Sequence, residues 1–232
     1  MDLSLIILTR NEENIVENNL KKINDFIKNL DNVKDYEIIV SDYSIDSTFS
    51  LTQSLSKDNS KILPVKAPRP GIGCGLITGI NLAKYEYIVF YPIDMAWDIK
   101  IIKESILELK ENCDVALGSR DIKNASSKRP LKRKIFSKGY NILINFLFKL
   151  KIKDTQGTLG IKKSDYEKYK NKLKSDGAFL QTEILIFSKM NNLRIKEIPS
   201  IVIDTRKDSS VKVFSFAIEM FRNALTMKQE LR

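Results

Sequence analysis

The sequence predicts an α/β protein built on a mostly parallel sheet flanked by helices. Up to residue 120, apolar runs of strand length alternate with segments of helical periodicity, the order that a parallel sheet with crossover helices requires. One of the runs, Tyr87–Tyr91, is unbroken and is followed by Pro92 and two acids, Asp94 and Asp98. Such a run is typical of a strand that is buried on both faces. Because ligands bind beyond the carboxyl ends of these strands, the acids mark a candidate site.

The first half of the chain supplies five predicted strands and the helices between them. The strands are the apolar runs Leu3–Leu8, Tyr36–Val40, Lys61–Val65, Tyr85–Ile93 and Asp114–Leu117. The helices are predicted at residues 20–30, from Asp46 or Ser47 to Leu55, at Ile80–Lys84 and at Ile99–Leu109. Thr9 or Asn11 is predicted to cap the first helix, since short polar side chains accept hydrogen bonds from its free amides. The glycine-rich segment Gly71–Gly79, which precedes the third helix, would let the backbone approach a phosphate.

After Arg120 the composition changes. Five cations lie within a seven-residue window: Lys128, Arg129, Lys132, Arg133 and Lys134. A largely apolar helix is predicted to follow over residues 135–150. This helix either packs in the core or lies against a lipid surface, and both interpretations stay open because anionic lipids attract lysine and arginine beside such a helix.

The rest of the chain predicts shorter elements and a final helix. They are a loop and strand at Asp154–Lys162, a small helix capped by Ser164, a helix at Ala178–Met190, edge strands at Arg194–Ile203, a loop at Arg206–Lys212 and an amphipathic helix at Val213–Lys228. No internal repeat or low-complexity linker interrupts the order.

The composition excludes several classes of function. The chain of 232 residues has no histidine, which rules out serine–histidine and cysteine–histidine catalysis. Cys74 and Cys113 have no CxxC spacing and predict reduced thiols in a reducing compartment. The first residues lack the features of a signal peptide, and no apolar run approaches the roughly 20 residues of a spanning helix. The formal charge of +10 favours an anionic partner, with a solvated lysine-rich surface as the alternative.

Short motifs follow one another in a fixed order over residues 3–212. They are Leu8–Glu12, Ser41–Thr48, Gly71–Gly79, Pro92–Asp94, Gly118–Arg120, Arg133 with Ser137 and Asn141, Asp154–Gly157, Gln181–Glu183 and Ser209–Lys212. Together they resemble the family 2 inverting glycosyltransferases, and among these the dolichol- and polyprenyl-phosphate mannosyl- and glucosyltransferases. The resemblance implies a GT-A fold over residues 1–212, with a nucleotide-sugar-binding half, 1–120, and an acceptor-binding half, 121–212. An amphipathic helix, 213–232, follows this domain.

The resemblance also implies which residues bind the donor. They are Thr9, Asn11, Glu12, Asp42, Ser44, Gly73, Asp94 and Lys212. Asp94 takes the place of the second acid in the family's Asp-x-Asp motif and is the expected ligand of Mg²⁺ or Mn²⁺. Four positions depart from the family: Pro92 replaces the first acid, and Ala96 lies where a further polar ligand is common. Ser41 and Tyr43 replace the first Asp and the Gly of the loop that reads the base and ribose. Lys212 with Arg69 is the alternative to a metal for neutralising the leaving diphosphate.

The acceptor phosphate is expected to bind Arg120, Arg133 and Ser137. The guanidinium fork of arginine suits this role because it binds oxyanions bidentately. Asp94, Arg120 and Arg133 are therefore the expected catalytic residues. A phosphate monoester is mostly ionised at neutral pH, so its attack needs no strong general base. The structural alternatives are that Arg120 pairs with an acid and that Asp42 and Asp154 cap turns or helices.

These observations predict transfer of mannose or glucose from a GDP- or UDP-sugar to a polyprenyl or dolichyl phosphate. The protein is expected in the cytoplasm, peripheral to the cytoplasmic membrane face, with a separate membrane-anchoring subunit as an option. One alternative is a GT-A protein that binds a nucleotide-sugar or a partner without metal-dependent transfer. Another is a glycosyltransferase with a non-lipid acceptor. Nucleic acid is not an expected partner, since no recognised binding motif accompanies the positive charge.

Overall fold

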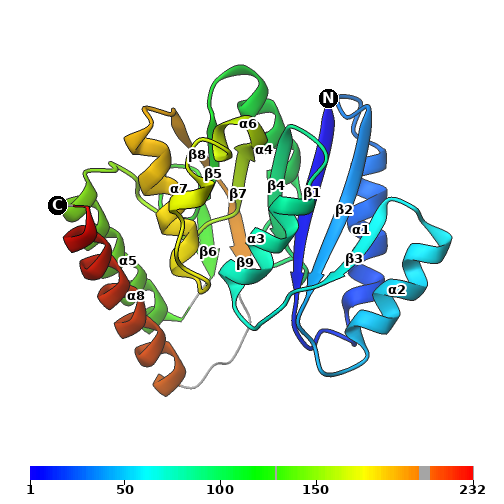
Figure 1. Cartoon of the computed structure of the whole chain (residues 1–232), viewed down its shortest axis with the longest axis horizontal. Coiled ribbons are helices and arrows are strands. Elements are labelled where there is room, and N and C mark those ends of the chain that lie inside the picture. Colours follow the sequence, from blue (N-terminus) through cyan, green and yellow to red (C-terminus); the bar gives the residue numbers. More distant parts are fainter. Residues whose placement is uncertain (129, 204–209, 232) are drawn as a thin grey trace.

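The computed structural model describes residues 1–128, 130–203 and 210–231, with only the backbone for 210–216. Its main sheet has seven strands in the order β3-β2-β1-β4-β7-β5-β8 (Figure 1). These are β1 Asp2–Thr9, β2 Asp35–Asp42, β3 Ile62–Lys66, β4 Tyr87–Pro92, β5 Val115–Ser119, β7 Leu159–Lys162 and β8 Ile195–Pro199. Every pairing is parallel except those of β7 with β4 and β5. The predicted α/β class and mostly parallel sheet are confirmed.

Helices cover both faces of this sheet (Figure 1). They are α1 Val16–Lys28, α2 Thr48–Asp58, α3 Ile72–Leu82, α4 Lys100–Glu111, α5 Leu131–Phe148, α6 Lys163–Tyr166, α7 Phe179–Met190 and α8 Ser210–Glu230, with a 3-10 turn at Lys170–Lys172. Alternate residues of β1 serve two separate cores, because successive strand side chains point to opposite faces. Leu5 and Ile7 pack with α1 and α4, whereas Ile6 packs with α3 and α7. In the described residues no helix is both long and apolar enough to cross a bilayer.

The strand register brings the loops of the nucleotide half to one edge of the sheet. Thr9 at the end of β1 pairs with Asp42 at the end of β2, and Leu8 pairs with Pro92 at the end of β4. The segments after these strands therefore emerge side by side. A second, two-stranded sheet of β6 Ser126–Lys128 and β9 Ile201–Ile203 lies beyond β5.

The structure differs from the sequence predictions at five places. The small helix α6 begins at Lys163 and has no side-chain cap, so Ser164 lies within it and does not cap it. The first helix, α1, begins at Val16 with no side-chain cap, so neither Thr9 nor Asn11 caps it. The third helix begins at Ile72, and most of the glycine-rich segment is therefore helical. The three-residue strand β6 was not predicted, because its Ser-Ser-Lys sequence carries no apolar pattern. The last helix begins at Ser210 and not at Val213, so Lys212 lies in its first turn.

Candidate functional site

The loops after β1 and β2 are joined by hydrogen bonds into one surface. The Asn11 amide donates to Ser44 Oγ at 2.8 Å, and the Ile45 amide donates to Asn11 Oδ1 at 3.1 Å. The Glu12 amide donates to Thr48 Oγ1 at 2.8 Å. Asn11 adopts a left-handed conformation with φ of 58°, which asparagine tolerates better than most residues. The structure thus brings together the first two predicted donor-binding motifs.

Asp42 is the buried centre of this surface. Its Oδ1 accepts hydrogen bonds from the hydroxyls of Thr9 at 2.7 Å and Ser44 at 2.6 Å, and its Oδ2 accepts one from the Ser44 amide at 3.0 Å. The residue is almost completely buried. In this structure Asp42 holds the two loops together, which agrees with the turn-capping alternative. Its predicted contact with the donor remains a prediction.

The glycines at the start of α3 have a packing reason of their own. A Cβ built at Gly73 would lie 2.7 Å from the Asp176 carbonyl carbon and 2.6 Å from the Gly177 oxygen. The Cys74 amide donates to the Asp176 oxygen at 2.8 Å, so one of the free amides of the helix start is already satisfied. Gly79 allows α3 to pack closely on Ile6 of β1. The structure therefore explains Gly73 by a backbone contact and Gly79 by a side-chain contact, and phosphate binding by Gly73 stays a prediction.

Asp94 lies in a tight turn directly after β4. Asn19 of α1 donates to the Ile93 carbonyl at 2.9 Å, and the Ala96 amide donates to Asp94 Oδ1 at 3.1 Å. Met95, the residue between Asp94 and Ala96, has a left-handed φ of 52°, which is strained for a side chain of this size. The turn fixes the Asp94 carboxylate at the edge of the sheet where the first two loops emerge.

The donor set around Asp94 limits the kind of metal that fits. No group of three or more histidine, cysteine or acidic residues with metal-site geometry occurs among the described residues. A single carboxylate fits a hard cation that takes its other ligands from substrate phosphates and water, the arrangement typical of Mg²⁺. Asp94 therefore fits a diphosphate-bound cation, whereas Pro92 and Ala96 add no ligand.

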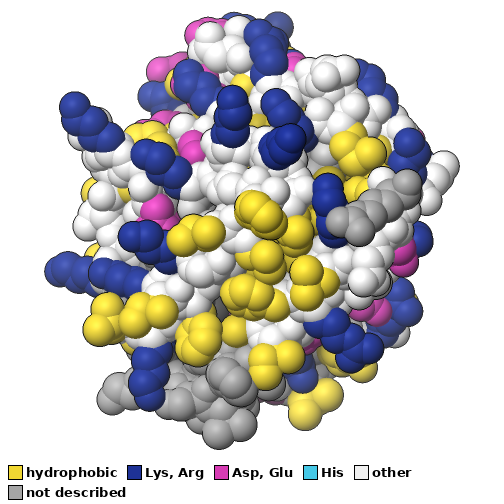
Figure 2. All heavy atoms as spheres, turned by 90° about the vertical axis from the view of Figure 1, so that its left-hand side faces the viewer, with side chains coloured by type: hydrophobic (Ala, Val, Ile, Leu, Met, Phe, Trp, Pro, Cys, Tyr) yellow, Lys and Arg dark blue, Asp and Glu magenta, His cyan; other side chains and the backbone are white. Residues whose placement is uncertain are grey.

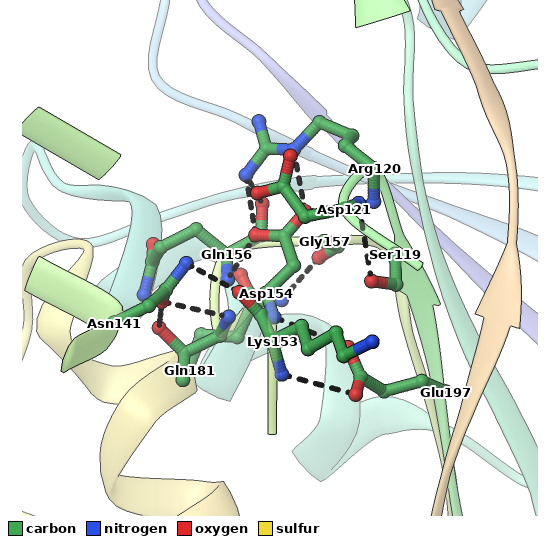
Figure 3. Close-up of polar contacts among 11 residues, drawn as sticks. Ser119, Arg120, Asp121, Asn141, Lys153, Asp154, Gln156, Gly157, Gln181 and Glu197 are labelled. Atoms are coloured by element: carbon green, nitrogen blue, oxygen red, sulfur yellow. Dashed lines mark hydrogen bonds and ion pairs between the residues drawn. The ribbon is translucent and has the colours of Figure 1, made fainter. Parts of the chain in front are cut away.

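The strongest polar contact of the second half joins Arg120, just after β5, to Asp154 (Figure 3). Arg120 Nε donates to Asp154 Oδ2 at 2.6 Å and Nη2 donates to Oδ1 at 2.7 Å, a bidentate pair. The Arg120 amide also donates to Oδ2 at 3.0 Å, and the guanidinium lies 5.3 Å from the Trp97 ring centre. The alternative that Arg120 pairs with an acid is confirmed. Its binding of an acceptor phosphate stays a prediction.

Burial strengthens the electrostatic interaction between Arg120 and Asp154. The Asp154 side chain is 0% exposed and that of Arg120 is 14% exposed. Burial alone would raise the pKa of Asp154, but the hydrogen bonds and the charge of Arg120 outweigh it and hold the pKa below its ordinary value. The two charges therefore form a fixed ion pair at neutral pH.

The loop that carries Asp154 is held from three sides (Figure 3). Asn141 of α5 donates to the Lys153 carbonyl at 2.7 Å, and its Oδ1 accepts from the Thr155 hydroxyl at 2.7 Å. Glu197 of β8 accepts hydrogen bonds from the Lys153 and Asp154 amides at 3.0 and 3.1 Å. Gln181 of α7 donates to the carbonyl of Gly157, which belongs to the same loop. The loop therefore joins α5, α7, β5 and β8 into one rigid unit.

Gly157 itself allows this loop to meet β5. A Cβ built there would overlap the carbonyl oxygen of Gly118 and would lie 3.2 Å from the Trp97 ring. Only a residue without a side chain fits between the loop and the strand. The Gly-Ser-Arg and Asp-Thr-Gln-Gly motifs are thus in direct contact, as one site.

Two of the predicted acceptor residues, Arg133 and Ser137, lie along one side of α5. Arg133, Ser137 and Asn141 follow at intervals of four residues, so they share a helix face. Since Asn141 contacts the Asp154 loop, this face leads towards the Arg120–Asp154 pair. The structure orients this helix face in this way but does not place a phosphate on it.

Two other candidates have different outcomes. Glu183 of α7 accepts hydrogen bonds from the Lys174 and Ser175 amides at 3.2 and 2.9 Å, and burial raises its pKa. It therefore holds a turn in the described structure. The side chain of Lys212, and the residue Ser209 of the same motif, lie outside the described residues.

Three residues of the site were missed or undervalued by sequence reasoning. Glu197 and Trp97 were not singled out, and Asn141 was noted only as part of a motif. Glu197 lies on an edge strand whose pattern shows nothing of the loop it holds. The adjacent cation-rich window could not show that Asn141 points inward. The one signal in the sequence was the side-chain amide of Asn141, which lies eight residues after Arg133 among apolar residues.

Comparison with known proteins agrees with this geometry. The sequence profile described as Glycosyl transferase family 2 matches residues 4–170. Glycosyltransferase AglD of Haloferax volcanii is 23% identical over 235 residues, all of this chain and 36% of AglD. Dolichol-phosphate mannosyltransferase of Pyrococcus furiosus is 28% identical over 232 residues, 96% of this chain and 63% of that protein. The chain thus covers less than two thirds of the length of either relative.

A solved structure shares the fold. Glucosyl-3-phosphoglycerate synthase from Mycobacterium tuberculosis, in complex with Mn²⁺, UDP and glucosyl-3-phosphoglycerate, matches with a TM-score of 0.72. The match covers 98% of this chain and 79% of that one, at 15% identity. It establishes a GT-A-like fold. Because the family profile also matches most of the chain, the protein belongs to glycosyl transferase family 2.

Proposed function

We propose that this chain transfers a hexose, mannose or glucose, from a nucleoside diphosphate sugar to a polyprenyl or dolichyl phosphate, with inversion at the anomeric carbon. The observation that carries the proposal is the relation between the two halves. The donor loops and Asp94 meet at one edge of the sheet, while the Arg133 face of α5 is tied through Asn141 to the Arg120–Asp154 pair. Each half thus presents a group suited to one of the two substrates. The relative named as a dolichol-phosphate mannosyltransferase supports the same class.

The chemistry asks mainly for charge neutralisation. The lipid phosphate is already ionised, so it attacks without a general base, which agrees with a chain that has no histidine. Arg133 and Ser137 bind and orient that phosphate. Asp154 holds the Arg120 guanidinium in place, so that this group is already oriented when the phosphate binds. A Mg²⁺ or Mn²⁺ ion held by Asp94 and the donor phosphates would supply positive charge to the leaving diphosphate.

Two rival functions rest on particular observations. The synthase that shares the fold is described with phosphoglycerate, a soluble acceptor, so a non-lipid acceptor is the second candidate. The exposed apolar side chains of α5 favour the lipid. A protein that binds without transfer is the third candidate. Pro92 supports it, as does Ser41, whose buried hydroxyl has no hydrogen-bond partner among the described residues.

Replacement of Asp94 tests the metal. Asp94→Ala is expected to weaken binding of GDP or UDP in the presence of Mg²⁺ or Mn²⁺ by roughly tenfold, because a charged ligand is lost. Isothermal titration with and without a chelator measures this. Asp98→Ala is the control, since Asp98 caps α4 through the Lys100 amide at 3.0 Å. Wild-type binding that is equally tight in the chelator would favour neutralisation by protein cations alone.

Transfer itself is tested with labelled sugars. A panel of GDP- and UDP-linked mannose and glucose is incubated with polyprenyl phosphate, with and without divalent metal, and the lipid product is extracted. We expect one donor to give a labelled lipid phosphate sugar. Nucleotide binding with no transfer from any donor would support the non-catalytic alternative.

The proposed place of action is the surface of a membrane, on its cytoplasmic side. A polyprenyl phosphate lies in a bilayer, and its head group is reached from the interface. A separate membrane-anchoring subunit is compatible with this arrangement. The protein need only present its acceptor face to the bilayer.

A further inference from the structure

The outer face of α5 exposes a continuous apolar stripe. Leu131, Ile135, Ile142 and Phe146 are 72%, 61%, 62% and 80% exposed. Their spacings of four, seven and four residues place them on one side of the helix. The opposite side carries Tyr140 and Ile144, which are buried in the core. The predicted core role of this helix is thus correct for one face, and the other face is open to solvent.

Helix α8 extends the apolar surface. Its buried residues Met220, Ala224 and Met227 pack in the core, and Phe221 meets Tyr140 of α5 edge-on at 5.8 Å. Its outward residues Ile218 and Leu225 are 52% and 50% exposed. Between the helices lies an open groove of about 490 Å³. It is lined by Phe136, Ala217, Ile218, Phe221, Arg222, Leu225, Thr226 and Gln229. We call the stripe and this groove the α5/α8 face.

The charges around this face are mostly positive. Figure 2 shows apolar side chains gathered at its centre with lysine and arginine around them. Helix α5 carries four cations and no acid. The two acids of α8 lie away from the groove, since Glu230 pairs with Lys174 at 2.8 Å and Glu219 lies near Gly177. Among the described residues that line the groove, Arg222 is the one that carries a charge. An apolar centre with a cationic surround is complementary to a bilayer that contains anionic lipids.

We propose that the α5/α8 face docks on a bilayer containing anionic lipids, with the apolar stripe in the interface and the lysines on the head groups. This docking rests on the proposed function and extends it. Helix α5 then has the bilayer on one side and the Asp154 loop on the other. Arg133 and Ser137 are half-buried and lie on the side of α5 away from the apolar stripe. A second copy of the chain would bring like charges together across the same surface, and so it fits less well.

The test is sedimentation with vesicles of phosphatidylcholine, with and without phosphatidylglycerol. The wild-type chain is expected to bind the anionic vesicles more tightly. Lys134→Ala with Lys138→Ala should weaken this binding by roughly 25-fold, since each interfacial lysine contributes about fivefold. Ile142→Ser with Phe146→Ser should weaken it by roughly tenfold or more, because apolar area no longer leaves water. All four positions are exposed, so folding should be retained.

Matched controls remove the same groups elsewhere. Lys21→Ala with Lys22→Ala takes two exposed cations from α1, on the far side of the sheet (Figure 1). Leu63→Ser with Leu82→Ser takes two exposed leucines from β3 and α3. Both control pairs should leave vesicle binding unchanged. Equal losses in the controls, or no loss in the face variants, would overturn the proposal. A concentration-dependent dimer that only the face variants disrupt, seen by light scattering, would replace the bilayer with a second copy.

Docking and transfer can fail separately. Vesicle binding is measured without a sugar donor, and transfer is measured in detergent without a bilayer. Binding with no transfer would remove the proposed function and leave the docking face. Transfer in detergent with no vesicle binding would remove the docking face and leave the proposed function.

Discussion

Asp154→Asn is expected to lower the free energy of unfolding by about 3–5 kcal/mol, because it leaves the charge of Arg120 buried without its anion. The substitution keeps the shape of the side chain, so the loss is electrostatic and not steric. Both partners are more than four-fifths buried, with 0% and 14% of their side chains exposed. Transfer should be lost as well, since Arg120 is no longer fixed. Urea unfolding followed by circular dichroism measures the stability.

The control is an exposed ion pair of similar length. Glu167 and Lys170 lie 2.6 Å apart with side chains 44% and 38% exposed. Glu167→Gln should change stability by about 1 kcal/mol or less, since water screens such pairs. If Asp154→Asn cost no more than this control, the buried pair would not be the structural centre of the second half.

The pH dependence of the pair gives an independent check with a definite sign. In the wild type the pKa of Asp154 lies below its unfolded value, so its contribution is complete above pH ~4 and is lost as the pH falls further. Arg120→Ala removes the charge and leaves burial, which raises the pKa. The folded variant then binds a proton before the unfolded chain does. Its stability deficit relative to wild type should therefore shrink as the pH is lowered from 7 towards 4, and a constant deficit would contradict the assignment.

Arg133→Ala is expected to reduce transfer to polyprenyl phosphate by roughly 10²–10³-fold, the usual cost of losing a charged group that stabilises a transition state. Binding of GDP or UDP should be unchanged, since the donor loops belong to the other half of the sheet. Radiolabel transfer in detergent and isothermal titration measure the two effects. Lys138→Ala removes an exposed cation from the same helix, and in detergent it should leave transfer near the wild-type rate. Unchanged transfer by Arg133→Ala would refute its role at the acceptor phosphate.

Local pattern predicted the nucleotide half well. The Tyr87–Tyr91 run reads as a doubly buried strand, and in the sheet β4 lies between β1 and β7 with Asp94 at its end. The family resemblance implied that the polar loops after β1 and β2 both bind the donor, and the register of Thr9 with Asp42 brings them together. Parallel strands impose this result, because their carboxyl ends must meet at one edge.

Contacts between distant segments were not predictable in the same way. Pairing of Arg120 with an acid was one of two alternatives, but its partner, Asp154, was not identified. The sequence does not show that β7 pairs antiparallel with β5 and so brings the loop before it to β5. The two glycines of this contact, Gly118 and Gly157, have no local feature that marks them as touching. The glycine-rich segment was expected to approach a phosphate because it precedes a helix, whereas the structure shows the backbone of Asp176 beside Gly71 and Gly73. Long-range packing decides such positions.

The identity of the acceptor is the central claim, and one competition experiment tests it directly. The chain in detergent is given one labelled donor together with equal amounts of polyprenyl phosphate and 3-phosphoglycerate, and both products are separated and counted. The account predicts label in the lipid product, and loss of that label in Arg133→Ala. Label in the phosphoglycerate product with none in the lipid would contradict it.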